Sequence, residues 1–254
     1  MLYYLYDGTF EGLLTCVFDV YFRNEIPDRI VNEETSLPLF TDTHPVITDE
    51  NKAERVLQGL EKKISKSAIN MLYYCHLSEM QDVELILLRY IQKALVSPVS
   101  IEVNFADDDV LALSKIYKKV SFERLRMFQF VRFQKTTDGI YFAVMDPIYN
   151  VLPLCAEFFQ DRYADQQWLV YDTRRNFGLF YDLTKTEIVR FEQPPVNLTT
   201  GKITAEQQDE SEKAFQDLWK EYLQAITIQS RKNLRLQRQF MPKRFWKYLI
   251  EKNA

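Results

Sequence analysis

Basic side chains interleaved with aromatic ones are the feature of this sequence with the clearest chemical meaning. They occur in residues 122–133 and again near the C-terminus. Guanidinium and ammonium groups neutralise phosphates, and exposed aromatic rings stack on unpaired bases. The pattern therefore predicts a nucleic-acid interface, and its candidate residues are Arg124, Arg126, Arg132, Arg174, Arg175, Arg231, Arg235, Arg238, Lys243 and Arg244.

A plainer interpretation of the same residues stays open. Aromatic side chains at strand or helix spacing most often belong to a hydrophobic core. Arg231, Arg235 and Arg238 form one stripe if a single helix carries them, since they are spaced at i, i+4 and i+7. Phosphate binding and an ordinary solvated face explain such a stripe equally well.

Carboxylates are the remaining candidates for catalysis. Burial raises the pKa of a carboxyl group enough for acid–base work, and Glu123, Asp165 and Asp172 are the candidates. Ion pairing explains them as well, for example between Glu123 and Arg126 or between Asp165 and Arg175. The sequence therefore assigns no nucleophile and no general base.

The signatures of other enzyme classes are absent from the sequence. It contains no glycine-rich phosphate loop, no HExxH and no GxSxG, and only 6 of its 254 residues are glycine. The two histidines, His44 and His76, are best explained as an exposed loop residue and a satisfied core residue. Three widely spaced cysteines favour neither a disulfide scaffold, nor a zinc site, nor an iron–sulfur cluster. We expect no metal and no cofactor.

The charge of the chain is unevenly distributed. The net charge is −4, yet residues 228–254 contain eight Lys or Arg and a single acid, Glu251. Such asymmetry is typical of a surface for phosphates or for an acidic partner. The sequence shows neither a signal peptide nor an apolar run of membrane-spanning length, so we expect a cytoplasmic protein without a membrane partner.

The elements that position these residues are predicted to form an α+β fold in one domain spanning 1–254. Its sub-regions are a mostly helical part over 1–120, an antiparallel sheet over 121–195 and helices over 196–254. In the first part, hydrophobic spacing predicts a strand over 2–6, an irregular stretch over 26–48, and helices over 9–23, 51–63, 66–77, 79–96 and from about 107 onward.

The central sheet is predicted to have about five antiparallel strands, with a helix over 151–163 inserted among them. Asp138-Gly139 supplies a tight hairpin turn. The strands are expected over 128–133, 140–145, 167–172, 177–181 and 186–191. After Pro194-Pro195 we expect a loop over 196–204 and a long helix from about 205, whose continuation carries the basic stripe. Pro242 is expected to open a short last helix.

Four stretches together are similar to the motifs of a known family. They read YDGTFEGLL at 6–14, ERLRMFQFVRF at 123–133, DRYADQQWLVYDTRR at 161–175 and MPKRFWKYL at 241–249. In this order they resemble a bacterial family of unknown function labelled "probable DNA metabolism protein". The resemblance covers essentially the whole chain.

The resemblance implies a stand-alone form of a domain that other members carry joined to a uracil-DNA-glycosylase-like domain. It also implies a radical-SAM protein, thought to modify or repair DNA, as a partner encoded nearby. No catalytic role is implied for any residue. Members often have a His-Phe pair in the inserted helix, where this chain has Glu157-Phe158.

Three hypotheses follow for the function. The first is an accessory protein of a DNA repair or modification system that binds DNA, a radical-SAM partner, or both. The alternative is an enzyme that acts on damaged or modified nucleic acid through carboxylates. The third is a protein-interaction scaffold whose basic end meets an acidic partner.

Overall fold

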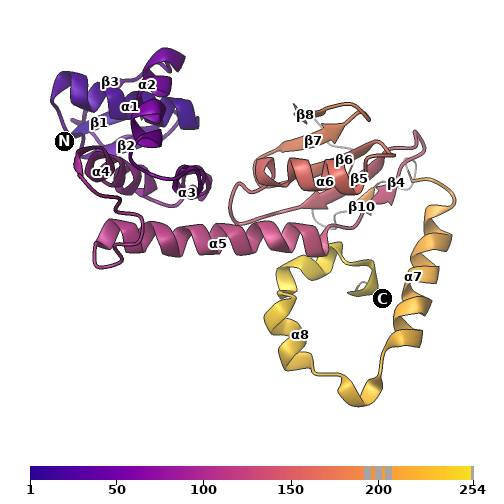
Figure 1. Cartoon of the computed structure of the whole chain (residues 1–254). Helices are drawn as coiled ribbons and strands as arrows, with labels where there is room; N and C mark the ends of the chain where they lie inside the picture. Colours follow the sequence, from indigo (N-terminus) through magenta and orange to yellow (C-terminus); the bar gives the residue numbers. More distant parts are fainter. Residues whose placement is uncertain (192–195, 198–201, 204–207, 253–254) are drawn as a thin grey trace. The chain divides into compact units, whose positions relative to one another are not determined.

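The computed structural model describes residues 1–191, 196–197, 202–203 and 208–252 and has an α+β fold, as predicted (Figure 1). The chain divides into two compact units, Met1–Ser121 and Phe122–Ala254. Helix α5 (Asp108–Phe130) contains the boundary between them.

The N-terminal unit contains a three-stranded parallel sheet and four helices that precede α5. The strand order is β2-β1-β3, with both outer strands parallel to β1. The elements are β1 (Leu2–Tyr6), α1 (Phe10–Arg23), β2 (Arg29–Asn32), β3 (Asp42–Pro45), α2 (Glu50–Glu61), α3 (Lys66–His76) and α4 (Val83–Val96). The helices agree with the predicted ones.

The prediction of an irregular stretch over 26–48 is wrong, because this stretch contains β2 and β3. Both strands are short, and β3 ends in Pro45. Each is held by hydrogen bonds to β1, which is far away in sequence. Such pairing leaves no local pattern in four-residue strands, so hydrophobic spacing misses them.

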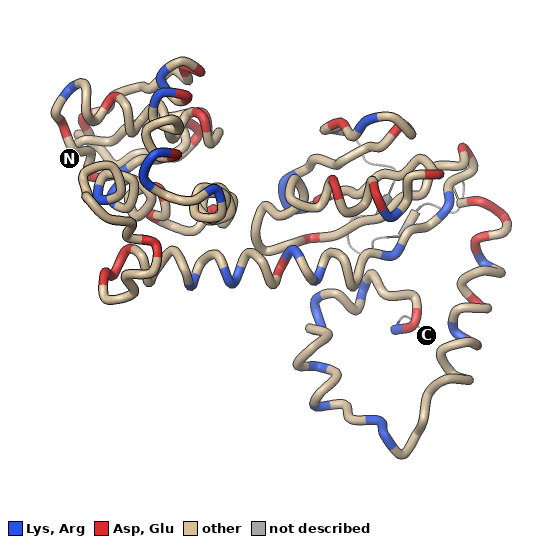
Figure 2. Tube along the Cα trace, in the orientation of Figure 1, with Lys and Arg blue, Asp and Glu red and all other residues tan. Residues whose placement is uncertain are grey.

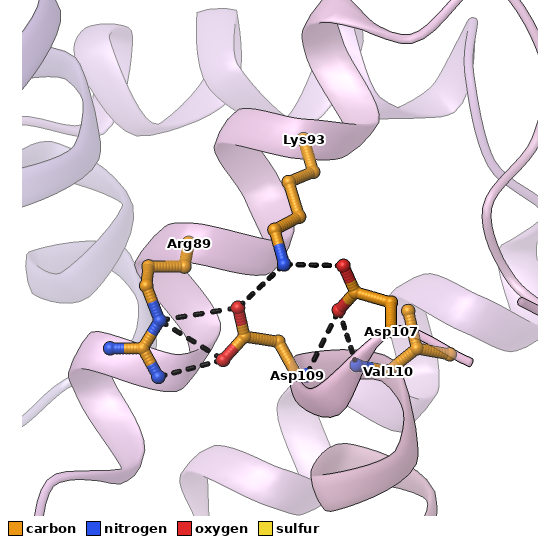
Figure 3. A network of polar contacts seen from close by, with 5 residues as sticks. All are labelled: Arg89, Lys93, Asp107, Asp109 and Val110. Carbon is orange, nitrogen blue, oxygen red and sulfur yellow. Dashed lines mark hydrogen bonds and ion pairs between the residues drawn. The ribbon is translucent and has the colours of Figure 1, made fainter. Parts of the chain in front are cut away.

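The start of α5 is fixed by a network of charged side chains (Figure 3). Asp107 Oδ1 accepts hydrogen bonds from the backbone N–H groups of Asp109 and Val110, at 2.9 and 3.2 Å. Arg89 donates hydrogen bonds from Nε and Nη2 to the buried Asp109 carboxylate, and Lys93 Nζ lies 2.8 Å from Asp109 Oδ2. The acidic start of α5 is thereby tied to α4.

The C-terminal unit is built on a five-stranded sheet with the order β4-β5-β6-β7-β8. The strands are β4 (Gln134–Lys135), β5 (Tyr141–Met145), β6 (Trp168–Asp172), β7 (Phe177–Tyr181) and β8 (Thr186–Val189). Between β5 and β6 the chain forms η1 (Pro153–Cys155) and α6 (Ala156–Arg162). Fully buried rings, such as those of Phe159, Trp168 and Tyr171, lie in its core.

One strand pair departs from the predicted antiparallel sheet, because β5 and β6 are parallel. The remaining pairs of this sheet are antiparallel. A parallel pair needs a crossover connection, and the inserted helix provides it. The carboxyl ends of β5 and β6 therefore lie side by side, with Met145 opposite Asp172.

The predicted strand over 128–133 is also wrong. Helix α5 continues to Phe130, and β4 comprises only two residues. Val120, Glu123, Met127 and Phe130 are all buried and follow helical spacing, so the aromatic residues belong to the helix.

The C-terminal helices are shorter than predicted. They are α7 (Glu212–Ile226), η2 (Gln229–Arg231), α8 (Leu234–Phe240), η3 (Lys243–Tyr248) and η4 (Ile250–Lys252). Thr227 has extended backbone angles and ends α7, so no single helix carries Arg231 together with Arg235 and Arg238. The predicted continuous stripe is therefore wrong, whereas a short helix does follow Pro242.

Two short strands, β9 (Val196–Asn197) and β10 (Lys202–Ile203), pair within the stretch predicted to be a loop. Pro194-Pro195 and residues 204–207 lie outside the described residues. The end of the sheet region that was expected at these prolines and the start of the helix predicted from about 205 therefore fall there. Among the described helices, none combines the length and the apolar character that crossing a bilayer requires.

Candidate nucleic-acid interface

Two aromatic side chains of the first predicted stretch, Phe128 and Phe130, pack against other rings of the C-terminal unit, whereas Phe122 is exposed. The Phe128 ring stacks on Phe158, with 3.8 Å between centroids, and Phe130 packs on Phe245 at 5.1 Å. Phe130 and Phe245 are buried. The core interpretation is thereby confirmed for Phe130 and Phe245.

Arg124 and Arg132 are held by contacts within the unit. Arg124 Nε donates to the carbonyl of Leu154 at 2.9 Å, and its guanidinium lies over the Phe128 ring. Arg132 Nη2 donates to Glu251 Oε1 at 2.9 Å, and Nη1 donates to two backbone carbonyls of its own segment. Both side chains therefore fix the end of α5 to its neighbours.

Glu123 is the centre of a buried ion-pair cluster. Its side chain is 1% exposed. Its Oε1 accepts a hydrogen bond from the backbone N–H of Ile148 at 2.8 Å, and its Oε2 pairs with Arg126 at 3.2 Å and with Arg244. The predicted pair of Glu123 with Arg126 is confirmed, and Arg244 joins it from η3.

Asp172 is a second buried carboxylate with arginine partners. Its Oδ1 accepts the backbone N–H groups of Arg174 and Arg175, at 2.8 and 3.3 Å, and its Oδ2 pairs with Arg175 Nη1 at 2.8 Å. Burial raises the pKa of Asp172, and Arg175 opposes this shift. Arg175 thus pairs with Asp172 rather than with the predicted Asp165, because the tight β6–β7 turn brings residues three apart together.

Both clusters hold the segment that follows β5. Arg175 donates to the carbonyls of Pro147 and Ile148, at 3.2 and 3.1 Å, and Arg174 reaches the Ile148 carbonyl at 3.4 Å. Asp146 pairs with Lys247 at 3.0 Å. Sequence reasoning missed this convergence, which depends on the parallel β5–β6 pair that places both strand ends at one edge.

The three candidate catalytic carboxylates do not form one site. Glu123 and Asp172 are each occupied by cations and backbone N–H groups. Asp165 is exposed and precedes β6, whereas Asp172 ends that strand, so the two aspartates lie at opposite ends of β6. Among the described residues, no group of three or more His, Cys, Asp or Glu is arranged to hold a metal ion.

The remaining predicted residues lie in a segment that we name the basic arm, residues 228–243. It holds five cations and no acid, and Figure 2 shows basic positions without an acidic one along α8. All five side chains are exposed, and within the described part of the chain none of them has an ion-pair partner: Arg231, Lys232, Arg235, Arg238 and Lys243. The structure therefore separates the ten predicted residues into six with contacts inside the fold and four on the arm.

Comparison with known proteins identifies a family. The profile of a family described as a domain of unknown function, DUF4130, matches residues 81–251. The chain belongs to this family. Searches of curated proteins and of solved structures found no significant match. The matched residues include the whole basic arm and both buried ion-pair clusters.

Proposed function

We propose that this DUF4130 protein is an accessory protein of a DNA repair or modification system and that it binds DNA through the basic arm. The arm supports the proposal because its five cations are exposed and have no carboxylate partner among the described residues. Unpaired cations at this density bind polyanions by releasing their counterions.

The other predicted residues contribute less to this proposal. Arg126, Arg175 and Arg244 pair with buried carboxylates, so binding a phosphate would leave a buried charge without its partner. In this proposal, these three arginines stabilise the fold of the C-terminal unit. The DNA contacts are therefore assigned to Arg231, Lys232, Arg235, Arg238 and Lys243.

The DNA-metabolism role and the radical-SAM partner rest on the resemblance of the four motifs. The arm has one property that fits a protein partner, because several of its apolar side chains are at least half exposed. These are Ile228, Leu234, Leu236 and Phe240. Exposed apolar side chains gathered on one segment are typical of protein interaction sites. The proposal therefore includes a partner protein docked beside the DNA.

The test is a salt series of DNA binding with two charge-matched variants. One variant replaces Arg231, Arg235 and Arg238 with Gln. The control replaces Lys115, Lys118 and Lys119, three exposed lysines of α5, with Gln. If each arm arginine contacts one phosphate, the arm variant lowers the slope of log affinity against log salt by about 2–3.

The control variant is expected to keep the wild-type slope. Equal binding by the arm variant and the wild type would remove the arm from the proposal. Product release from a damaged oligonucleotide by the purified protein alone would favour the enzyme hypothesis instead. That hypothesis stays a prediction, with Glu123, Asp165 and Asp172 as its residues.

A further inference from the structure

Two cavities follow one another along helix α7. The first has a volume of about 250 Å³, and its lining includes the rings of Phe133, Tyr141, Phe215 and Trp219. The second has a volume of about 390 Å³, and its lining includes three lysines and three glutamines: Lys220, Lys232, Lys252, Gln224, Gln229 and Gln237.

The two cavities are neighbours along one face of α7, and we name them together the α7 groove. Gln216 lines the first cavity, and Lys220 and Gln224 line the second. These residues are four apart and therefore share one face of the helix. The η4 segment continues in the same order, since Ile250 lines the first cavity and Lys252 the second.

The first half of the groove offers aromatic surface. Phe215 is 63% exposed and Trp219 is 37% exposed, and the cavity that they line also includes Tyr141 of β5. The guanidinium of Arg132 lies 5.9 Å from the Trp219 ring. Exposed rings next to a cation are the arrangement on which unpaired bases stack.

The second half of the groove is polar and cationic. Its acid, Glu251, is already bound, because its Oε1 accepts from Arg132 at 2.9 Å and its Oε2 accepts from Trp219 Nε1 at 3.3 Å. Lys232 has no ion-pair partner among the described residues, and Lys220 lies 3.7 Å from a single aspartate, Asp217. The lysines and the amide side chains are therefore donors that suit phosphate oxygens.

We propose that the α7 groove binds single-stranded nucleic acid, with an unpaired base in the aromatic half and the adjoining phosphates in the lysine half. This inference rests on the proposed function and specifies its substrate. A base in a duplex is stacked on both faces, so only an unpaired or extruded base enters the aromatic cavity. The groove shares Lys232 with the basic arm, but Arg231, Arg235 and Arg238 do not line it, so the arm variant removes no side chain of the groove.

The experiment compares Phe215→Ala with Leu218→Ala. Both side chains are exposed apolar residues of α7, 63% and 60% respectively, but only Phe215 lines the groove. Binding is measured by fluorescence anisotropy with a labelled ten-nucleotide single strand and with the matching duplex. F215A is expected to weaken single-strand binding about five- to 100-fold, the range found for loss of one base–aromatic stack. Duplex binding by F215A, and both forms of binding by L218A, are expected to stay within about twofold of wild type.

Tryptophan fluorescence gives a second measurement. Of the three tryptophans, Trp168 is fully buried and Trp219 lines the groove. The single strand is expected to quench the emission of Trp219, and W219F is expected to lose most of the quenching.

Equal single-strand affinity of F215A and L218A, with the arm variant still impaired, would overturn the groove and leave the proposed function intact. No binding of either DNA to the wild type would overturn both.

Discussion

Replacing Glu123 is predicted to destabilise the C-terminal unit strongly. Glu123→Ala removes the carboxylate that binds the Ile148 N–H, Arg126 and Arg244. Breaking a buried ion pair from one side costs about 3–5 kcal/mol, because the partner charge stays buried without compensation. Arg126 and Arg244 are partly exposed, at 34% and 25%, so water compensates part of this cost. We therefore expect about 3 kcal/mol for E123A.

Glu123→Gln removes the negative charge of the side chain but keeps its shape. The amide oxygen still accepts the Ile148 N–H, whereas the ion pairs with Arg126 and Arg244 are lost. We expect E123Q to lose about 1.5–2 kcal/mol, less than E123A. The matched control is Glu157→Gln, since Glu157 is exposed on α6 and has no ion-pair partner among the described residues.

The assay is urea unfolding of the full chain followed by tryptophan fluorescence. All three tryptophans, Trp168, Trp219 and Trp246, lie within Phe122–Ala254, so their emission reports the C-terminal unit alone. With a urea m-value of about 1.5 kcal/mol/M, E123A is expected to lower the midpoint by about 2 M. Equal midpoints for E123A and E157Q would refute the assignment of Glu123 as the centre of this cluster.

Two further predictions concern titration and thiol reactivity. Burial raises the pKa of Asp109, but the hydrogen bonds from Arg89 and Lys93 outweigh burial and lower it below 3.8. The stability that these bonds add is present above the unfolded value and is lost as the pH falls through the lowered pKa. Asp109→Asn is therefore expected to destabilise the N-terminal unit by about 2 kcal/mol at pH 6 and by much less at pH 2. Unfolding followed by circular dichroism at both pH values tests this, and a pH-independent difference would contradict it. The three cysteines are buried, and burial raises the pKa of each thiol, that of Cys75 to about 12. Ellman's reagent at pH 8 is expected to label no thiol rapidly in the native protein and all three after unfolding. Rapid labelling of even one native cysteine would show that it is accessible.

The local pattern of hydrophobic residues is sufficient to predict many of the helices and strands. The helices α1 to α4 and strands β5 to β8 are predicted from the sequence, because each helix buries one face with a regular period and turn residues bound the strands. Strands β2 and β3 were missed, since four-residue strands beside prolines carry no such period. The parallel β5–β6 pair was also missed, because strand direction depends on the path of the crossover and not on either strand's residues.

The candidate site also has properties that the sequence predicts and properties that only the structure shows. Composition alone shows that residues 228–254 are basic, and every arginine carries its charge wherever it lies. Local spacing predicted the pair of Glu123 with Arg126, but it could not show that Arg244 joins this pair from η3 or that Arg175 pairs with Asp172. It also gives no sign of the α7 groove, whose lining comes from segments as far apart in the sequence as Phe133 and Ile250.

Residue type and spacing set the charge of each segment and the face that each helix buries, since both are properties of a few neighbouring residues. Tertiary packing determines which of these charged side chains remain available to bind a ligand. A guanidinium group that pairs with a buried carboxylate is held in place by that ion pair, because the low dielectric constant around the carboxylate strengthens it. A guanidinium group on the basic arm is surrounded by water instead. Contacts within the fold therefore distinguish six arginines from the four cations of the basic arm, although the sequence gives all ten the same charge.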